Sequence, residues 1–178
     1  MTPNNVTGII VADDDSVIRD VLRTRLEALD LNVFLACDGL EAVDLALRID
    51  AALIILDLKM PRLNGLLACE RIRQLPRNAK TPIAILTALP GMDAAAAAAE
   101  VGATAYFAKP FRPVLLLQAL SQFLPISDAM RDQIRHNADL ASGIARPPAA
   151  PTGVLTSARP GSEGPLDRGK NILDVLRS

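Results

Sequence analysis

Between residues 7 and 124 the chain alternates short strand-like segments with longer helix-like segments, five of each. The strand-like segments are continuous apolar runs, and the helix-like segments repeat apolar residues at the three- and four-residue spacing of one helix face. Consecutive parallel strands are joined through a crossover helix, and strands covered on both faces read as uninterrupted apolar runs. The pattern therefore predicts an α/β fold built on a parallel, doubly wound sheet. The expected strands cover residues 7–12, 32–36, 53–56, 83–86 and 104–108, and the expected helices cover residues 16–29, 40–49, 65–75, 93–101 and 112–124.

A further helix is expected directly after this repeat. Ser127 is a predicted N-cap for a helix that ends near Gly143. Ile126, Met130 and Ile134 recur every four residues, so this helix is expected to pack on the preceding helix and its neighbouring face. Such packing would let the extension cover the surface through which the main domain acts.

The last part of the chain is rich in Pro, Gly, Ala and Ser, a composition typical of a linker or disordered tail. Its end carries Ile172, Leu173 and Leu176, which we interpret as a short docking motif. The expected divisions are a domain over residues 1–125, an extra helix over 126–144, and a linker with a short C-terminal motif over 145–178.

The composition narrows the class of protein. Half of the 178 residues are apolar and the formal net charge is -1, which allows a full core and predicts neither nucleic acid nor a membrane as a partner. Cys37 and Cys69 have no metal or redox spacing and are predicted to be small core residues, as in a reducing compartment. The polar start lacks the apolar run of a signal peptide, so a cytoplasmic location is expected.

Charged and polar residues follow four of the five expected strands. Asp13 and Asp14 follow the first strand, and Asp57 ends the third. Thr87 follows the fourth strand and Lys109 the fifth. Because the carboxyl ends of parallel strands share one edge, where open α/β sheets bind their ligands, these side chains are expected to form one site.

These residue types suit phosphoryl transfer. Clustered carboxylates repel one another unless a cation joins them, and Mg²⁺ prefers carboxylate, water and phosphate oxygens. Lys109 and the Thr87 hydroxyl are suited to bind phosphoryl oxygens and to neutralise the charge that develops during transfer. A carboxylate can itself be the nucleophile, so Asp57 is the predicted site of an aspartyl phosphate.

Over residues 7–125 the sequence resembles the receiver domain of bacterial two-component response regulators, the CheY-like family. The resemblance implies a flavodoxin-like sheet of five parallel strands in the order 2-1-3-4-5, with five helices. It rests on Asp13-Asp14, on Asp57-Leu58-Lys59-Met60-Pro61 with Gly65, on Thr87-Ala88, and on Tyr106-Phe107-Ala108-Lys109-Pro110-Phe111.

The resemblance also assigns roles. Asp57 would accept the phosphoryl group, with Thr87 and Lys109 on its oxygens. Asp14 and Asp57 would bind Mg²⁺ directly. Asp13 would act on the ion largely through water. The backbone carbonyl of Lys59 would be a further Mg²⁺ ligand, and Asp15 would cap the first helix. Lys59 and Leu89 would flank the phosphoryl group. Thr87 and Tyr106 would form a switch pair, and the peptide bond before Pro110 would be cis.

The implied function is that of a single-domain response regulator. A sensor histidine kinase or phosphotransfer protein would phosphorylate Asp57, and the signal would pass to an unknown protein target. The chain would catalyse only its own Mg²⁺-dependent phosphorylation and dephosphorylation, so it is not expected to be an enzyme in the usual sense. It would be a monomer or a phosphorylation-dependent dimer.

Three alternatives remain open. The run Asp13-Asp14-Asp15-Ser16-Val17 also fits the Asp-x-Asp motif of haloacid dehalogenase-like phosphatases, but the sequence offers no acidic pair after Lys109 and this reading leaves Asp57 unexplained. The chain could be the receiver part of a truncated transcriptional regulator, although the residues from Ser127 onward carry no basic face. It could also be a docking module that acts without phosphorylation, which the complete site disfavours.

Overall fold

A central parallel sheet organises the computed structural model, which describes residues 7–88, 92–142 and 153–154. Five parallel strands lie in the order β2-β1-β3-β4-β5, which confirms the predicted fold and strand order. A sixth strand, β6, extends the sheet beyond β5. The strands are β1 (Thr7–Ala12), β2 (Val33–Ala36), β3 (Asp50–Asp57), β4 (Ile83–Thr87), β5 (Ala105–Ala108) and β6 (Gly153–Val154).

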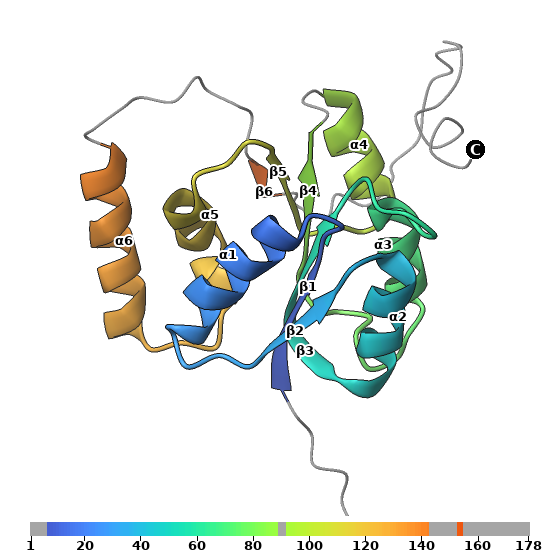
Figure 1. Ribbon diagram of the computed structural model, residues 1–178, viewed down its shortest axis with the longest axis horizontal. Coiled ribbons are helices and arrows are strands. Elements are labelled where there is room, and N and C mark those ends of the chain that lie inside the picture. Colours follow the sequence, from blue (N-terminus) through green and yellow to red (C-terminus); the bar gives the residue numbers. More distant parts are fainter. Residues whose placement is uncertain (1–6, 89–91, 143–152, 155–178) are drawn as a thin grey trace, which may run out of the picture.

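Helices cover both faces of the sheet, and each face has its own core (Figure 1). Alternate residues of one strand enter different cores: Ile9 packs with α1 and α5, whereas Ile10 packs with α2, α3 and α4. This two-sided burial explains why the strands read as continuous apolar runs. The helices are α1 (Ser16–Glu27), α2 (Gly39–Arg48), α3 (Gly65–Arg73), α4 (Met92–Glu100), α5 (Pro113–Leu120) and α6 (Asp128–Ser142), with a short 3₁₀ turn over Ser121–Phe123.

Two local expectations were wrong in detail. β3 begins at Asp50 and not at residue 53, because its first residues pair with β1 through a register shift between Gly8 and Ile9. The apolar residues of α1 do not all enter the core. Leu22 is fully buried, whereas Val17 is 66% exposed, because the sheet covers only a narrow stripe of this helix.

The predicted extra helix is present as α6. The Ser127 hydroxyl accepts a hydrogen bond from the Met130 backbone N–H at 3.3 Å. Ile134 is buried, and Met130 packs against the α1–α5 core. A groove lined by Arg25 of α1, Leu117 of α5 and Ile134 separates α6 from α1. The helix therefore lies on the α1 side of α5, and the expectation that it covers the face next to α5 and β5 was wrong.

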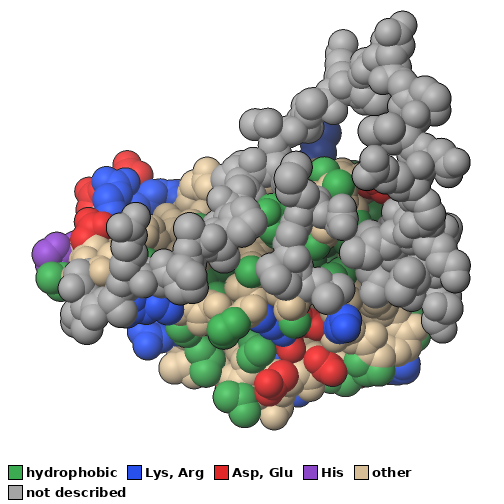
Figure 2. Space-filling model, turned by 90° about the horizontal axis from the view of Figure 1, so that it is seen from above, with side chains coloured by type: hydrophobic (Ala, Val, Ile, Leu, Met, Phe, Trp, Pro, Cys, Tyr) green, Lys and Arg blue, Asp and Glu red, His purple; other side chains and the backbone are tan. Residues whose placement is uncertain are grey.

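The outer surface of α6 is mostly polar, although Leu140 is 59% exposed. His136 is exposed, and charged side chains of both signs lie near it (Figure 2). No helix in the described ranges is long and apolar enough to cross a membrane.

Part of the expected linker is a strand. β6 pairs antiparallel with β5, with Val154 opposite Ala105 and Gly153 opposite Tyr106. Composition alone predicts a linker here, because a two-residue strand has no periodicity of its own. The proposed docking motif at Ile172, Leu173 and Leu176 lies outside the described residues.

Arg131 holds the turn that precedes α6. Its guanidinium donates hydrogen bonds to the backbone carbonyls of Ser121, Leu124 (3.0 Å) and Ile126 (3.1 Å). These carbonyls follow the end of α5, where backbone acceptors have no partner within the helix. One side chain therefore joins α6 to the C-terminal end of α5.

We expect Arg131→Ala to lower the free energy of unfolding by about 1–3 kcal/mol, because hydrogen bonds from a charged donor to partly buried carbonyls are lost. Urea unfolding followed by circular dichroism measures this change. Arg135→Ala is the matched control, since Arg135 is exposed and pairs only with Asp132 of the same helix among the contacts described. Equal losses in the two variants would show that the Arg131 bonds do not anchor α6.

Candidate functional site

The carboxyl ends of four adjacent strands form one rim. Asp13 follows β1, Asp57 ends β3, Thr87 ends β4 and Lys109 follows β5. The register aligns these ends, since Asp57 is opposite Leu86 and Thr87 is opposite Ala108. The strand order thus places residues that lie up to 96 positions apart in the sequence at one place.

Lys109 bridges two buried carboxylates at this rim. Its Nζ lies 2.5 Å from Oδ1 of Asp57 and 2.7 Å from Oδ2 of Asp13. Asp13 is fully buried, Asp57 is 4% exposed, and the Lys109 side chain is 16% exposed. Two buried carboxylates are stable here because one ammonium group is shared between them.

The burial of this cluster changes the acidity of its groups. Burial raises the pKa of the Asp57 carboxyl, and the negative charge of Asp13 acts in the same direction. The Lys109 ammonium and the Lys59 backbone N–H oppose this rise. Burial by itself would lower the pKa of Lys109, but its hydrogen bonds to Asp13 and Asp57 raise it above its ordinary value. Lys109 is therefore held as a cation beside the predicted phosphoacceptor.

The donor set at the rim fits a hard divalent cation. Carboxylate oxygens of Asp13, Asp14 and Asp57 all lie within 4.8 Å of one another. Asp14 is exposed, so a cation could enter from solvent and keep water ligands, as Mg²⁺ does. The Lys59 side chain is also exposed. That its backbone carbonyl is a ligand stays a prediction.

The loop after β3 packs tightly on the Asp57 backbone. The Leu58 N–H donates to the Leu86 carbonyl at 2.7 Å, and the Gly65 N–H donates to the Leu58 carbonyl at 3.0 Å. A Cβ atom on Gly65 would lie 2.1 Å from the Asp57 carbonyl oxygen, so only glycine fits where α3 begins. Met60 and Leu63 are buried and attach the loop to the core.

Thr87 and Tyr106 are neighbours in the interior. Thr87 is 1% exposed and Tyr106 is 5% exposed. Both line a small cavity together with Ala94 and Ala97 of α4. The aromatic ring is thus turned inward in this structure, against a helix whose small side chains leave it room. The role of this pair as a switch stays a prediction.

The remaining residues at the rim have local roles. The Asp15 side chain accepts a hydrogen bond from the Val17 N–H at 2.8 Å and caps α1. The Lys109–Pro110 peptide bond is cis, and the Lys109 N–H donates to the Thr87 carbonyl at 2.6 Å. Leu89 lies outside the described residues.

Sequence reasoning missed one residue at this site. The Arg19 guanidinium donates to the backbone carbonyl of Asp13 at 2.5 Å, which ties α1 to the loop that carries the acidic residues. Nothing in the sequence distinguishes Arg19 from the other arginines of α1, because the contact depends on how the helix docks.

Comparison with known proteins identifies the family. The family model described as the response regulator receiver domain matches residues 9–121. The chain belongs to this family. Proteins of the family are signalling domains of two-component systems that are phosphorylated on Asp with Mg²⁺. The match covers the whole rim and ends before α6.

Several curated relatives of the receiver are named as transcriptional regulators. The chain is 32% identical over 135 residues to the DNA-binding dual master transcriptional regulator RpaA of Synechocystis sp., covering 76% of this chain and 56% of that protein. It is 39% identical over 105 residues to the probable transcriptional regulator ycf27 of Porphyridium aerugineum, covering 59% and 42%. The chain thus spans about half the length of the curated relatives it matches.

Solved receiver structures share the fold. The chemotaxis protein CheY4 of Vibrio cholerae has 30% sequence identity and a TM-score of 0.63, covering 67% of this chain and 99% of that one. The receiver domain of a sensor histidine kinase from Pseudomonas aeruginosa has 30% identity and a TM-score of 0.60, covering 65% and 95%. That second structure holds a magnesium ion in its active site cleft.

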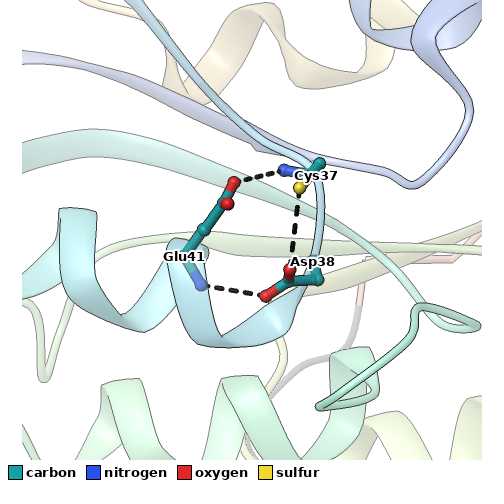
Figure 3. A group of neighbouring side chains, drawn as sticks. All are labelled: Cys37, Asp38 and Glu41. Carbon is teal, nitrogen blue, oxygen red and sulfur yellow. Dashed lines mark hydrogen bonds between the residues drawn. The ribbon is translucent and has the colours of Figure 1, made fainter.

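The receiver carries a second polar cluster that contains a cysteine (Figure 3). Cys37 is exposed and not in the core, because β2 ends at Ala36 and the chain turns there into α2; only the prediction for Cys69 was correct. The Cys37 N–H donates to the Glu41 carboxylate at 2.9 Å, and Asp38 caps α2 through the N–H groups of Leu40 and Glu41.

Both carboxylates of this second cluster already pair with one arginine. The Arg62 guanidinium pairs with the buried carboxylate of Asp38 and, at 3.2 Å, with that of Glu41. Asp38 accepts from the Glu41 N–H as the N-cap of a capping box does, whereas the Glu41 carboxylate accepts from the N–H of Cys37, one residue before the cap. The cluster therefore joins the start of α2 to the loop after β3 and is explained as structure.

We expect the two thiols to react very differently with a thiol-specific reagent. Cys37 is exposed, although its hydrogen bond with Glu41 raises its pKa, so it should react in the native protein at a rate that increases with pH. Cys69 is fully buried, and burial raises its pKa to about 11, so it should react only after unfolding. Counting reacted thiols with and without guanidinium checks this expectation, and Cys37→Ser should abolish the native reaction. Rapid native labelling of Cys69 would contradict its burial, and no native labelling of Cys37 would contradict its exposure.

Proposed function

We propose that Asp57 is the phosphoacceptor of a single-domain response regulator that signals by binding another protein. The observation that carries the proposal is the shared Lys109 ammonium, which lies within 2.7 Å of both Asp57 and Asp13 on a rim that also holds Asp14 and Thr87. A structural ion pair alone would not need a third, exposed carboxylate within the same group. The arrangement is suited to receive a phosphoryl group and to balance its charge.

The proposed reaction is a transfer from a phosphorylated histidine. A carboxylate oxygen of Asp57 attacks phosphorus, a new O–P bond forms, and the P–N bond to the imidazole breaks. The electron pair of that bond stays on the imidazole nitrogen, and the product is an acyl phosphate. Lys109 and the Thr87 hydroxyl bind the phosphoryl oxygens and stabilise the charge that develops on them.

A bound Mg²⁺ would be held by Asp14, Asp57 and the Lys59 carbonyl, with Asp13 acting through water, and would add positive charge at the phosphoryl oxygens. Neighbouring residues of the chain orient the Asp57 carboxylate. Gly65 lets α3 begin against the Asp57 backbone, and the pairing of β3 with β4 fixes the direction of the carboxylate.

The proposed partners are proteins. α1 starts beside the rim and leaves Val17 and Val21 exposed, which offers a protein donor an apolar contact near Asp57. From Ser127 onward the chain has seven basic and six acidic residues, so the charge offers no basic face for nucleic acid. The DNA-binding role named for one relative belongs to a protein of which this chain spans 56%. That this chain binds no nucleic acid stays a prediction.

Thr87 and Tyr106 are the proposed output switch. A phosphoryl group on Asp57 would draw the Thr87 hydroxyl toward it and change the cavity that Thr87 and Tyr106 share. The equilibrium between two packings of α4, β5 and α5 would then shift. Since Tyr106 is already buried, phosphorylation would stabilise this inward packing over one in which the ring is exposed.

The acceptor assignment predicts that Asp57→Asn reduces phosphorylation by acetyl phosphate at least about a hundredfold, because the nucleophile is removed. Incorporation of labelled phosphate that is lost on treatment with base or hydroxylamine measures the acyl phosphate. Asp14→Asn should raise the Mg²⁺ concentration needed for half-maximal labelling. Asp139→Asn, an exposed aspartate of α6, is the control. Unchanged labelling of the Asp57 variant would refute the assignment.

The switch predicts a spectroscopic change at Tyr106. Because the chain has one tyrosine, incorporation of 3-fluorotyrosine gives a single fluorine resonance. That resonance should shift when beryllofluoride and Mg²⁺ are added to the wild-type protein. Thr87→Val, which removes the hydroxyl and keeps the shape, should bind beryllofluoride with a much smaller shift at Tyr106. A wild-type resonance that does not move while beryllofluoride is bound would exclude the switch.

A further inference from the structure

β5 is the last of the five parallel strands, and its outer edge would otherwise present unpaired backbone groups. Such an edge binds extended segments readily, including strands of other molecules. In this structure β6 occupies it, with Gly153 and Val154 paired antiparallel to Tyr106 and Ala105. Figure 1 shows this short strand beside β5, at the margin of the sheet.

The chain is long enough to supply this strand from its own extension. α6 ends at Ser142, and ten residues, 143–152, precede β6. Ten residues reach up to about 35 Å when extended. α6 is anchored on α5, and residues of α5 share one core with β5.

The sequence around β6 suits a short edge strand. Thr152, Val154, Leu155 and Thr156 are good or adequate strand formers in a tail otherwise rich in Pro and Ala. Pro151 precedes the strand, and proline is tolerated at strand edges but not within a ladder. A strand of two paired residues is weak, so a competitor that makes a longer ladder could displace it.

The register is matched to the residues of β5. Gly153, which has no side chain, is opposite Tyr106, the bulkiest residue of that strand. Val154 is opposite Ala105, a small residue. A shift by one position would place valine opposite tyrosine, whereas the observed register sets glycine opposite the largest residue of β5.

We propose that β6 is a displaceable cap, formed by the same chain, which occupies the strand-docking edge of β5 beside Tyr106 and keeps other extended segments off that edge. A partner that adds a strand to β5 must first displace residues 153–154. The effective concentration of the tethered cap is high, so even a weak pairing keeps the edge closed to free peptides. Any link between the cap and phosphorylation through Tyr106 rests on the proposed function, whereas the cap itself does not.

The test uses the full chain without any phosphoryl donor, so its result does not depend on whether Asp57 is phosphorylated. Amide hydrogen exchange of residues 105–107 is measured by NMR in the wild type and in the double variant Gly153→Pro/Val154→Pro. We expect exchange at the outward amides to become at least about threefold faster in the variant, because local pairing is lost. Ala149→Pro, the same change elsewhere in the tail, is the control and should exchange like the wild type.

Two results would overturn the proposal. Equal exchange in the wild type and the double variant would show that residues 153–154 do not protect the edge. Protection that increases with protein concentration would assign the strand to a second copy of the chain, whereas a cap from the same chain gives protection that does not depend on concentration.

Discussion

The contact of Lys109 with Asp13 and Asp57 is the interaction on which the rim depends. Asp13 and Asp57 are buried carboxylates on neighbouring strand ends, and each would be costly to bury without a cation. Lys109 follows β5, so its side chain must pass the end of β4 to reach both acids. Only a long, flexible cation on that strand can do this, which explains why a lysine stands there.

The same contact determines the charge that a phosphoryl group would meet at Asp57 in the proposed reaction. One ammonium group already faces two carboxylates, so a phosphoryl group on Asp57 adds negative charge to a cluster in which acids already outnumber the cation. The surroundings must respond, either by binding a cation at exposed Asp14 or by bringing the Thr87 hydroxyl closer. Thr87 and Tyr106 share a small cavity, so the proposed switch would act at this part of the interior.

The elements beyond the family match use two surfaces that the receiver fold leaves open. α6 packs on α5 and borders a groove with α1, held by the bonds of Arg131 to the preceding turn. β6 pairs with the free edge of β5. α6 is thus anchored by a helix face, whereas β6 is held only by a short ladder. The proposed cap, β6, is therefore the more easily released of the two.

The sequence by itself determined the fold and which residues lie together at the site. Apolar runs and helical spacing arise from the local chain, and the carboxyl ends of parallel strands always share one edge. For that reason Asp13, Asp57, Thr87 and Lys109 could be assigned to one place without any coordinates. The spacing of Ile126, Met130 and Ile134 likewise predicted that the last helix packs on α5, as it does.

Only the tertiary structure decided which contacts those elements make. It placed the Lys109 ammonium between two acids and brought Arg19 to the Asp13 carbonyl. It left Cys37 exposed and set α6 on the α1 side of α5. It also paired Gly153 with Tyr106. Each of these contacts joins segments far apart in the chain, or depends on the surface that a segment meets. Local periodicity describes one segment at a time, so it carries no information about which neighbour that segment will find.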